Sequence, residues 1–381
     1  MSKPRVAVVL FNLGGPDAPE AVKPFLFNLF RDKAILTVPN PFRFFLAKLI
    51  SSRRTPVAQR IYAQLGGRSP LVPLTQAQAD GLKISLSDTW EVEVFPCMRY
   101  WHPMSDEVVQ AVKAFAPDHI IALPLYAQYS TATTASSFRD WRRAAKKSGL
   151  EVPTSYVCCY PTEEQFIRAH AELIRPVYEA AKAHGTPRIL FSAHGLPEKT
   201  VAGGDPYQWQ VERTTAKVLE LLQSMEEGYG KEAGSADHAS LEPIAERFSP
   251  CERQNGAQRG KQINYINCYQ SRVGPLKWIG PATDEEIKRG GRDGVPLVVV
   301  PVSFVSEHSE TLVELDIEYG KLAAEHGVPY YGRVPALGDY PGFITSLAHI
   351  CKTAYKHAGV KPAEAPQRYC REDWKQCPCA A

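Results

Sequence analysis

Three glutamates near the end of the sequence have a spacing suited to metal or proton chemistry. Glu310, Glu314 and Glu318 recur at every fourth residue, so a helix would stack their carboxylates on one face. Such a stripe is ordinarily a solvated acidic face. Here the flanking residues are apolar: Val313, Leu315, Ile317 and Leu322. Three like charges at this spacing also repel unless cations or protons pass between them, which favours a conduit for metal ions or protons.

One histidine stands where an imidazole could act on a bound molecule. His194 follows the apolar run RILFSA, and Gly195 and Pro197 after it predict a turn. A histidine inside a core usually makes only a packing hydrogen bond, whereas one at the end of a strand can face a cleft. Neutral imidazole accepts a proton near pH 7 and ligates transition metals. We therefore expect an exposed, oriented imidazole at His194.

The last residues of the sequence hold a concentrated group of thiols. Cys370, Cys377 and Cys379 lie within ten residues of one another. An idle tail is one interpretation, but this spacing favours zinc or a [2Fe–2S] cluster, and either would need a fourth ligand. Cys158 and Cys159 are adjacent to each other and lie far from this group in the sequence. The other cysteines are scattered and are interpreted as free structural thiols: Cys97, Cys251, Cys268 and Cys351.

Short apolar runs alternate with amphipathic segments along most of the chain, and they predict the elements that position these residues. The expected strands lie within 6–15, 92–103, 119–130, 188–197, 263–271 and 295–308. Near-continuous Val, Ile and Leu are typical of strands buried on both faces of a parallel sheet. The fold class predicted is therefore α/β, with doubly wound parallel sheets flanked by helices in two similar halves.

The predicted domain organisation follows the same alternation. We expect an N-terminal domain at 1–175, a C-terminal domain at 176–350 and a cysteine-bearing extension at 351–381. Residues 224–262 are rich in Gly, Ser and Glu, and we interpret them as an insertion that is mobile in part.

Every predicted strand ends in a polar or aromatic group of residues. Ligands of open α/β sheets bind outside the carboxyl ends of the strands, so six such ends predict a cleft. The NLGGP sequence after the first strand lacks the spacing of a phosphate-binding loop, which disfavours a nucleotide site. Its glycines instead predict a close approach of the backbone to a neighbour.

Composition narrows the class of protein. The 381 residues are 44% hydrophobic and 22% charged, with a net charge of +3, as in a globular protein without a strongly basic face. This balance disfavours nucleic acid as a partner. No apolar run approaches the ~18–20 residues of a membrane span, and the opening residues predict a strand and not a signal peptide. The odd total of nine cysteines argues against a disulfide framework. We expect a cytoplasmic protein.

The order of the motifs resembles that of ferrochelatases over about residues 5–350. The matching sequences are FNLGGP, SSRRTP, GGRSPL, MRYWHP, LYAQYS, SAHGLP, DPYQWQVE, CYQSRVGPLKWIGP and SEHSETLVELDIEY. The resemblance implies two Rossmann-like domains around a porphyrin cleft and insertion of ferrous iron into protoporphyrin IX to form protohaem. It also implies that His194 and Glu310 are the metal-site pair, continued by Glu314 and Glu318.

The resemblance further implies a porphyrin pocket. The wall candidates are Leu13, Tyr62, Tyr100, Tyr129 and Trp278, and the candidates for binding the porphyrin carboxylates are Arg53, Arg54, Ser69 and Arg99. Residues 40–56 combine large apolar side chains with basic ones, which fits a buried helix or an exposed lip. The resemblance favours the lip, in peripheral contact with porphyrin or the inner face of the membrane.

Some ferrochelatases hold a [2Fe–2S] cluster with C-terminal cysteines and one internal cysteine. The animal form takes its internal ligand from a position that is Thr131 here. The resemblance therefore leaves Cys158 or Cys159 as the partner of Cys370, Cys377 and Cys379, and we choose Cys158. A zinc site is the alternative.

Four functional questions stay open at this stage. Coproporphyrin could replace protoporphyrin as substrate, although an apolar lip favours protoporphyrin, which has two propionates and not four. The same cleft could belong to a non-catalytic carrier of tetrapyrroles or metals. Nitrogen and oxygen ligands suit Fe²⁺, Co²⁺ and Zn²⁺ alike, so the residues alone do not select iron. Nor do they decide which of His194 and Glu310 accepts protons and which delivers the metal.

Overall fold

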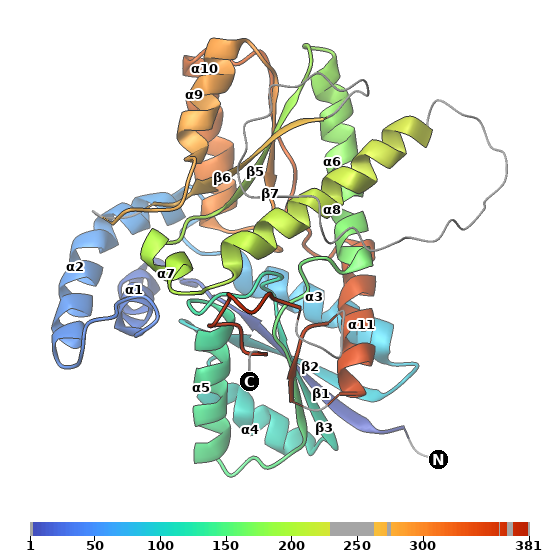
Figure 1. The fold of residues 1–381 in the computed structure, drawn as a ribbon. Coiled ribbons are helices and arrows are strands. Elements are labelled where there is room, and N and C mark those ends of the chain that lie inside the picture. Colours follow the sequence, from blue (N-terminus) through green and yellow to red (C-terminus); the bar gives the residue numbers. More distant parts are fainter. Residues whose placement is uncertain (1–2, 229–262, 273–275, 358, 364–368, 380–381) are drawn as a thin grey trace.

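The protein is described by a computed structural model covering residues 3–228, 263–272, 276–357, 359–363 and 369–379. Its strands form two parallel sheets (Figure 1). The first has the order β2-β1-β3-β4-β9, with β1 (Arg5–Asn12), β2 (Glu91–Met98), β3 (His119–Pro124), β4 (Thr154–Val157) and β9 (Gly359–Lys361). The second has the order β6-β5-β7-β8, with β5 (Arg188–His194), β6 (Asn264–Gln270), β7 (Leu297–Pro301) and β8 (Tyr331–Arg333).

Helices flank both sheets. Those before β5 are α1 (Val22–Arg31), α2 (Phe42–Ala63), α3 (Leu71–Leu86), α4 (Ser105–Phe115), α5 (Thr134–Lys147) and α6 (Glu164–Lys182). Those after it are α7 (Glu198–Ala202), α8 (Tyr207–Gly228), α9 (Thr283–Asp293), α10 (Tyr319–Glu325) and α11 (Pro341–Tyr355). A short 3₁₀ turn, η1 (Pro19–Ala21), precedes α1, and a π-helix, η2 (Glu310–Glu318), precedes α10. The predicted α/β class is confirmed, and all six predicted strands are present.

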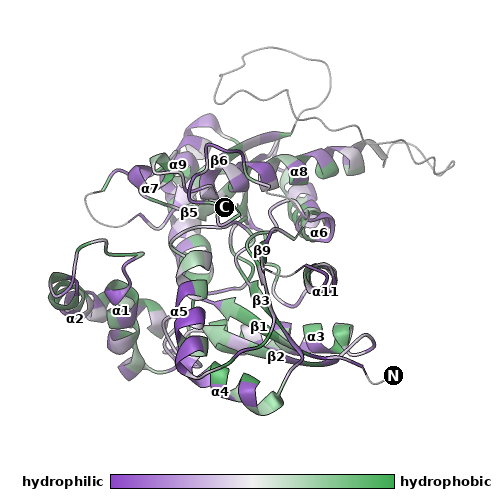
Figure 2. Ribbon diagram, turned by 60° about the horizontal axis from the view of Figure 1, so that its bottom comes forward, coloured by the Kyte–Doolittle hydropathy of each residue, from purple (hydrophilic) through white to green (hydrophobic). Residues whose placement is uncertain are grey.

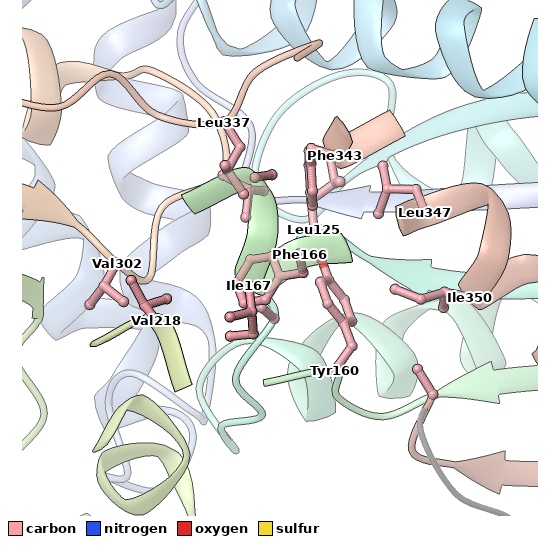
Figure 3. Packing of buried hydrophobic residues seen from close by; sticks show 14 of the residues in the cluster. Leu125, Tyr160, Phe166, Ile167, Val218, Val302, Leu337, Phe343, Leu347 and Ile350 are labelled. Carbon is pink, nitrogen blue, oxygen red and sulfur yellow. The ribbon is translucent and has the colours of Figure 1, made fainter. Parts of the chain in front are cut away.

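The sheets are held together by apolar side chains from both halves of the chain. Strands β1 and β7 are buried along almost their whole length, as expected for parallel strands covered by helices. One hydrophobic cluster includes Val8 of the first sheet, Phe191 and Val300 of the second, and residues of the helices between them. Figure 3 shows part of this cluster, where Phe166 of α6 lies near Phe343 of α11.

The end of the chain returns to the first sheet. Helix α11 packs against α3, β3 and β4, and β9 pairs with β4. In Figure 2 the strands β1 and β3 are mostly green, and helix α5 beside them carries purple, hydrophilic stretches. The region predicted as an insertion begins within α8, and its remainder, 229–262 with Cys251, lies outside the described residues.

Candidate metal and porphyrin site

His194 and Glu310 face each other, one at the carboxyl end of a strand and the other at the amino end of a helix. His194 is the last residue of β5 and Glu310 the first of η2, with 3.7 Å between His194 Nε2 and a Glu310 carboxylate oxygen. Their side chains are 39% and 33% exposed, so a ligand can reach both. His194 Nδ1 lies 2.6 Å from the carbonyl oxygen of Gly195, which can only accept a hydrogen bond. In neutral imidazole this places the proton on Nδ1 and the lone pair on Nε2, toward the carboxylate.

A lone pair and a carboxylate at this separation do not attract each other. They are complementary to a positive species between them, either a metal ion or a proton. This is the chemistry that the sequence predicted for the pair.

The turn after β5 fixes the imidazole. The backbone N–H of His194 donates to Ser303 Oγ at 3.2 Å, and that of Gly195 donates to the Gln270 carbonyl at 2.9 Å. A Cβ at position 195 would lie 3.2 Å from Cε3 of Trp278 and 3.0 Å from the Gln270 oxygen. Glycine at this position therefore lets the indole of Trp278 pack directly over the turn that carries His194.

The acidic segment is a π-helix, which changes the geometry expected from the spacing. The prediction assumed α-helical stacking of residues four apart, whereas η2 closes its turns at i→i+5. Glu310 and Glu314 are partly buried, but Glu318 and Ile317 are exposed. The stripe of partly buried carboxylates thus continues inward only as far as Glu314. Glu318 is exposed to solvent, as on an ordinary acidic helix face.

Glu314 is held by donors from two neighbouring segments. Ser271 donates to it through its backbone N–H at 3.0 Å and its hydroxyl at 2.5 Å, and Tyr319 donates its hydroxyl at 2.9 Å. Burial, together with the charge of Glu310, raises the pKa of Glu314 despite these hydrogen bonds. Sequence reasoning missed Ser271 and Tyr319, although Ser271 is the last residue of a predicted strand range and directly follows β6.

Tyr62 connects helix α2 to the metal pair. It lies near the end of α2, is almost fully buried, and packs in one cluster with Leu13. Burial raises the pKa of Tyr62 to about 12, with smaller effects from the neighbouring Ser309 hydroxyl and Glu310 carboxylate. Tyr62, which packs with Leu13 of the first half, therefore lies near Ser309 and Glu310 of the second.

The predicted carboxylate binders have different environments. Arg53 is exposed on α2, and the Arg54 guanidinium lies 6.0 Å from the ring centroid of Phe30. Ser69 is buried and accepts a hydrogen bond from the backbone N–H of Leu71 at 3.3 Å. A Cβ at Gly15 would be 2.4 Å from Ser69 Oγ, so the close approach predicted for the NLGGP loop occurs against Ser69.

Arg99 and Tyr100 are engaged by a buried carboxylate. Arg99 Nη2 lies 2.8 Å from Asp32 Oδ2, and the Tyr100 hydroxyl donates to the same oxygen at 2.9 Å. Ser136 also donates to Asp32. No motif in the sequence pointed to Asp32, because its partners come from distant segments.

Tyr129 packs against thiols. It shares a small cluster with Cys158 and Cys159, and its backbone N–H donates to Gln210 Oε1 at 2.7 Å. The other end of the Gln210 side chain donates to Cys370 Sγ at 3.1 Å. Tyr129 therefore joins the first sheet to the C-terminal tail.

The structure brings together the internal and C-terminal cysteines, which we term the thiol group: Cys158, Cys159, Cys370, Cys377 and Cys379. Cys158 Sγ lies 3.5 Å from that of Cys159 and 3.4 Å from that of Cys379. The adjacent Cys377 thiol, together with burial, raises the pKa of Cys370.

Sulfur is the donor that zinc and iron–sulfur clusters require, and these separations approach the about 3.8 Å between two sulfurs on one tetrahedral ion with 2.3 Å bonds. The donor set therefore fits such a group. The thiols nevertheless contact one another directly: within the described residues, no three His, Cys, Asp or Glu side chains are arranged around a common metal position. The remaining described cysteines are buried free thiols, as predicted: Cys97, Cys268 and Cys351.

Two parallel sheets flanked by helices, with a histidine–carboxylate pair at the end of β5, fit an α/β enzyme that handles a metal ion, and the comparisons specify the family. The family model for ferrochelatases matches residues 5–355. The ferrochelatase of Caulobacter vibrioides is 47% identical over 378 residues, covering 98% of this chain and 97% of the relative. That of Pelagibacter ubique is 44% identical over 377 residues, covering 98% of both chains. The chain belongs to the ferrochelatase family, and the predicted family is confirmed.

A solved structure supports the fold independently. The structure of SirB from Bacillus subtilis with Fe³⁺ matches with a TM-score of 0.50, covering 93% of this chain and 96% of that chain. Its identity is 13%, so this likeness concerns the fold alone.

Proposed function

We propose that this enzyme inserts ferrous iron into protoporphyrin IX and releases protohaem. The observation that carries the proposal is the open His194–Glu310 pair, in which an imidazole lone pair and a carboxylate are 3.7 Å apart. Membership of the ferrochelatase family supports the same reaction.

Metallation of a porphyrin requires that two pyrrole protons leave, that the ion lose its water, and that the ring bend. His194 is suited to accept the protons, because its Nδ1 is committed to the Gly195 carbonyl and its Nε2 is free to take one. Glu310 is suited to bind the incoming ion. Glu314 next to it, fixed by Ser271 and Tyr319, extends the acidic path away from the ring.

The porphyrin pocket of this proposal uses residues around the pair. Leu13, Tyr62 and Trp278 form the apolar walls, and Arg53, Arg54 and Ser69 bind the propionates. Arg99, Tyr100 and Tyr129 are candidates from the sequence, but the polar groups of the Arg99 and Tyr100 side chains are engaged by Asp32, and Tyr129 packs with Cys158 and Cys159. We therefore assign these three a supporting role behind the walls.

The exposed apolar surface of α2 is the proposed lip of the cleft. The exposed large side chains in this region are Val38, Phe42, Phe44, Phe45, Leu49 and Val57. Such a patch is unusual on a surface without a partner, and basic residues of the same helix accompany it. We propose that this lip contacts an anionic membrane surface peripherally. Among the described residues, no helix is long and apolar enough to cross a membrane.

We also propose a [2Fe–2S] cluster in the thiol group, with Cys370, Cys377, Cys379 and Cys158 as ligands. Cys158 is preferred to Cys159 because its sulfur directly contacts that of Cys379 in the tail. A cluster or a zinc ion would require thiolates, so its binding would release protons.

An anaerobic insertion assay tests the substrate assignment. Fe²⁺ is supplied with protoporphyrin IX or coproporphyrin III, and kcat/KM is measured for each. We expect the protoporphyrin value to be higher. A higher value for coproporphyrin would reassign the substrate, and binding of both porphyrins without insertion of iron would make the protein a carrier.

A further inference from the structure

We infer that Arg333 is a positioning residue for metal insertion, because it fixes both flanks of the segment that presents Glu310. The inference rests on the proposed function and assigns a role to a residue outside the cleft. Arg333 ends strand β8 and is only 12% exposed. Its role is visible in the contacts that it makes with the acidic segment.

The Arg333 guanidinium binds two carboxylates at once. Its Nε and Nη2 donate to the two oxygens of Asp316 at 2.6 and 2.5 Å, which is bidentate pairing. Its Nη1 donates to Glu307, which also accepts a hydrogen bond from the backbone N–H of Ala336 at 2.9 Å. Nε, Nη1 and Nη2 thus each donate to a carboxylate of the segment around η2, and Nη1 also donates to the Val334 carbonyl at 3.4 Å.

The two carboxylates bracket the metal-site glutamate. Glu307 precedes Glu310 by three residues, and Asp316 lies within η2 beyond Glu314. Strand β8 adds a third contact, because the Tyr331 hydroxyl donates to the Leu315 carbonyl at 2.7 Å. Since β8 pairs with β7 in the second sheet, these contacts tie η2 to the sheet that also carries His194.

A π-helix has particular need of such ties. Its hydrogen bonding is uncommon and occurs mostly as short stretches at functional sites. Without Arg333, Glu307 and Asp316 would repel each other, and the segment around η2 would lose two of its contacts with β8 while keeping that of the Tyr331 hydroxyl. The distance between Glu310 and His194 would then vary, whereas the proposed porphyrin walls, which lie on other segments, would stay in place.

The test compares Arg333→Met and Arg333→Lys with a matched control. Arg188→Met removes an equally buried arginine, 11% exposed, from β5 of the same sheet. Arg188 Nη1 lies 2.8 Å from Asp293 Oδ2 on α9, away from η2. Zn²⁺ and protoporphyrin are the probes, and the readouts are kcat, KM for the metal, the Kd for porphyrin and the Tm.

We expect Arg333→Met to lower kcat/KM for the metal about 10- to 100-fold, as small misplacements of a reacting group do, and to leave the porphyrin Kd unchanged. Lysine should restore part of the activity, since it keeps a charge but not the fork. Arg188→Met should lower the Tm without changing the metal KM. Unchanged metal kinetics in Arg333→Met, or an equal loss in Arg188→Met, would overturn the inference.

A second variant covers failure of Arg333→Met to fold. Asp316→Asn removes the bidentate partner and keeps Glu307, so a smaller loss of kcat/KM for the metal is expected, and no loss would again overturn the positioning role. Absence of insertion by the unmodified enzyme would instead contradict the proposed function, so the two failures are distinguishable.

Discussion

Glu310, Glu314 and Glu318 have three different environments, and the chemistry of each carboxylate depends on them. Glu310 faces an imidazole nitrogen, Glu314 is buried among donors, and Glu318 is exposed. An exposed carboxylate is solvated by water and interacts only weakly with its neighbours, so replacing it has little effect. The three glutamates should therefore differ strongly when each is replaced by glutamine.

We predict that Glu310→Gln lowers kcat for metal insertion by about 10²- to 10³-fold, the usual effect of removing a positioned catalytic group. Glu314→Gln should have an intermediate effect, and Glu318→Gln should leave kcat nearly unchanged. Steady-state insertion of Zn²⁺ into protoporphyrin measures all three variants. Equal and negligible effects would assign the whole stripe to solvent and contradict the proposed path.

The residue types near the site could be predicted, but their partners could not. A histidine at a strand end and regularly spaced glutamates are local patterns, so His194 and Glu310 were found from the sequence. The engagement of Arg99 by Asp32 involves residues 67 positions apart, and no local pattern reports such a contact. Glu318 was placed in the stripe because an α-helical period was assumed, whereas the local helix is a π-helix.

At the scale of elements, Asp32 joins three segments of the chain. It follows α1 and binds Arg99 after β2 and Ser136 of α5. We predict that Asp32→Asn lowers the free energy of unfolding by about 3–5 kcal/mol at pH 7, because it leaves the partly buried Arg99 without its counter-charge. Urea unfolding of both proteins measures this difference.

The same carboxylate predicts how this difference depends on pH. Although burial acts to raise it, the pKa of Asp32 is held below its ordinary value of 3.8 by Arg99 and by hydrogen bonds from Ala34, Ser136 and Tyr100. A lowered folded-state pKa gives stability that is present above pH 3.8 and is lost as the pH falls through the folded-state value. The difference in free energy of unfolding between wild type and Asp32→Asn should therefore become smaller only at acidic pH. A difference in free energy of unfolding that is constant from pH 7 to pH 3 would contradict this account.

The C-terminal tail is the second element with a testable property. Replacing Cys370, Cys377 or Cys379 by serine should abolish visible charge-transfer absorption and lower the Tm, because a cluster would anchor the tail to the first sheet. Cys97→Ser is the matched control, since Cys97 is a buried thiol elsewhere in that sheet. Iron, sulfide and zinc are measured after anaerobic purification. Zinc without sulfide would replace the cluster by a zinc site, and the absence of any metal would refute both.

The long elements could be predicted, and the short ones could not. Strands such as β1 and β2 have eight residues each, enough for an apolar run to stand out. Strands β8 and β9 have three residues each, and their pairing depends on tertiary contacts. The return of α11 and β9 to the first sheet is likewise a property of the assembled chain.

At the scale of the whole molecule, the exposed face of α2 should decide membrane contact. We predict that Phe42→Asp combined with Phe45→Asp strongly reduces co-sedimentation with vesicles containing phosphatidylglycerol, because it removes apolar area and adds negative charge. Ile84→Asp is the control, since Ile84 on α3 is 74% exposed, like Phe42 at 71%. Equal binding by the two variants, or no binding by wild type, would contradict the proposed lip.

The central claim is that His194, opposite Glu310, performs the chemistry, and that the porphyrin is held by other residues. The most direct test measures porphyrin binding and anaerobic Fe²⁺ insertion in the same preparation of His194→Ala. The account predicts that insertion is abolished while the porphyrin Kd changes by less than about tenfold, ~1.4 kcal/mol. A variant that still inserts iron at a near-normal rate would contradict the account.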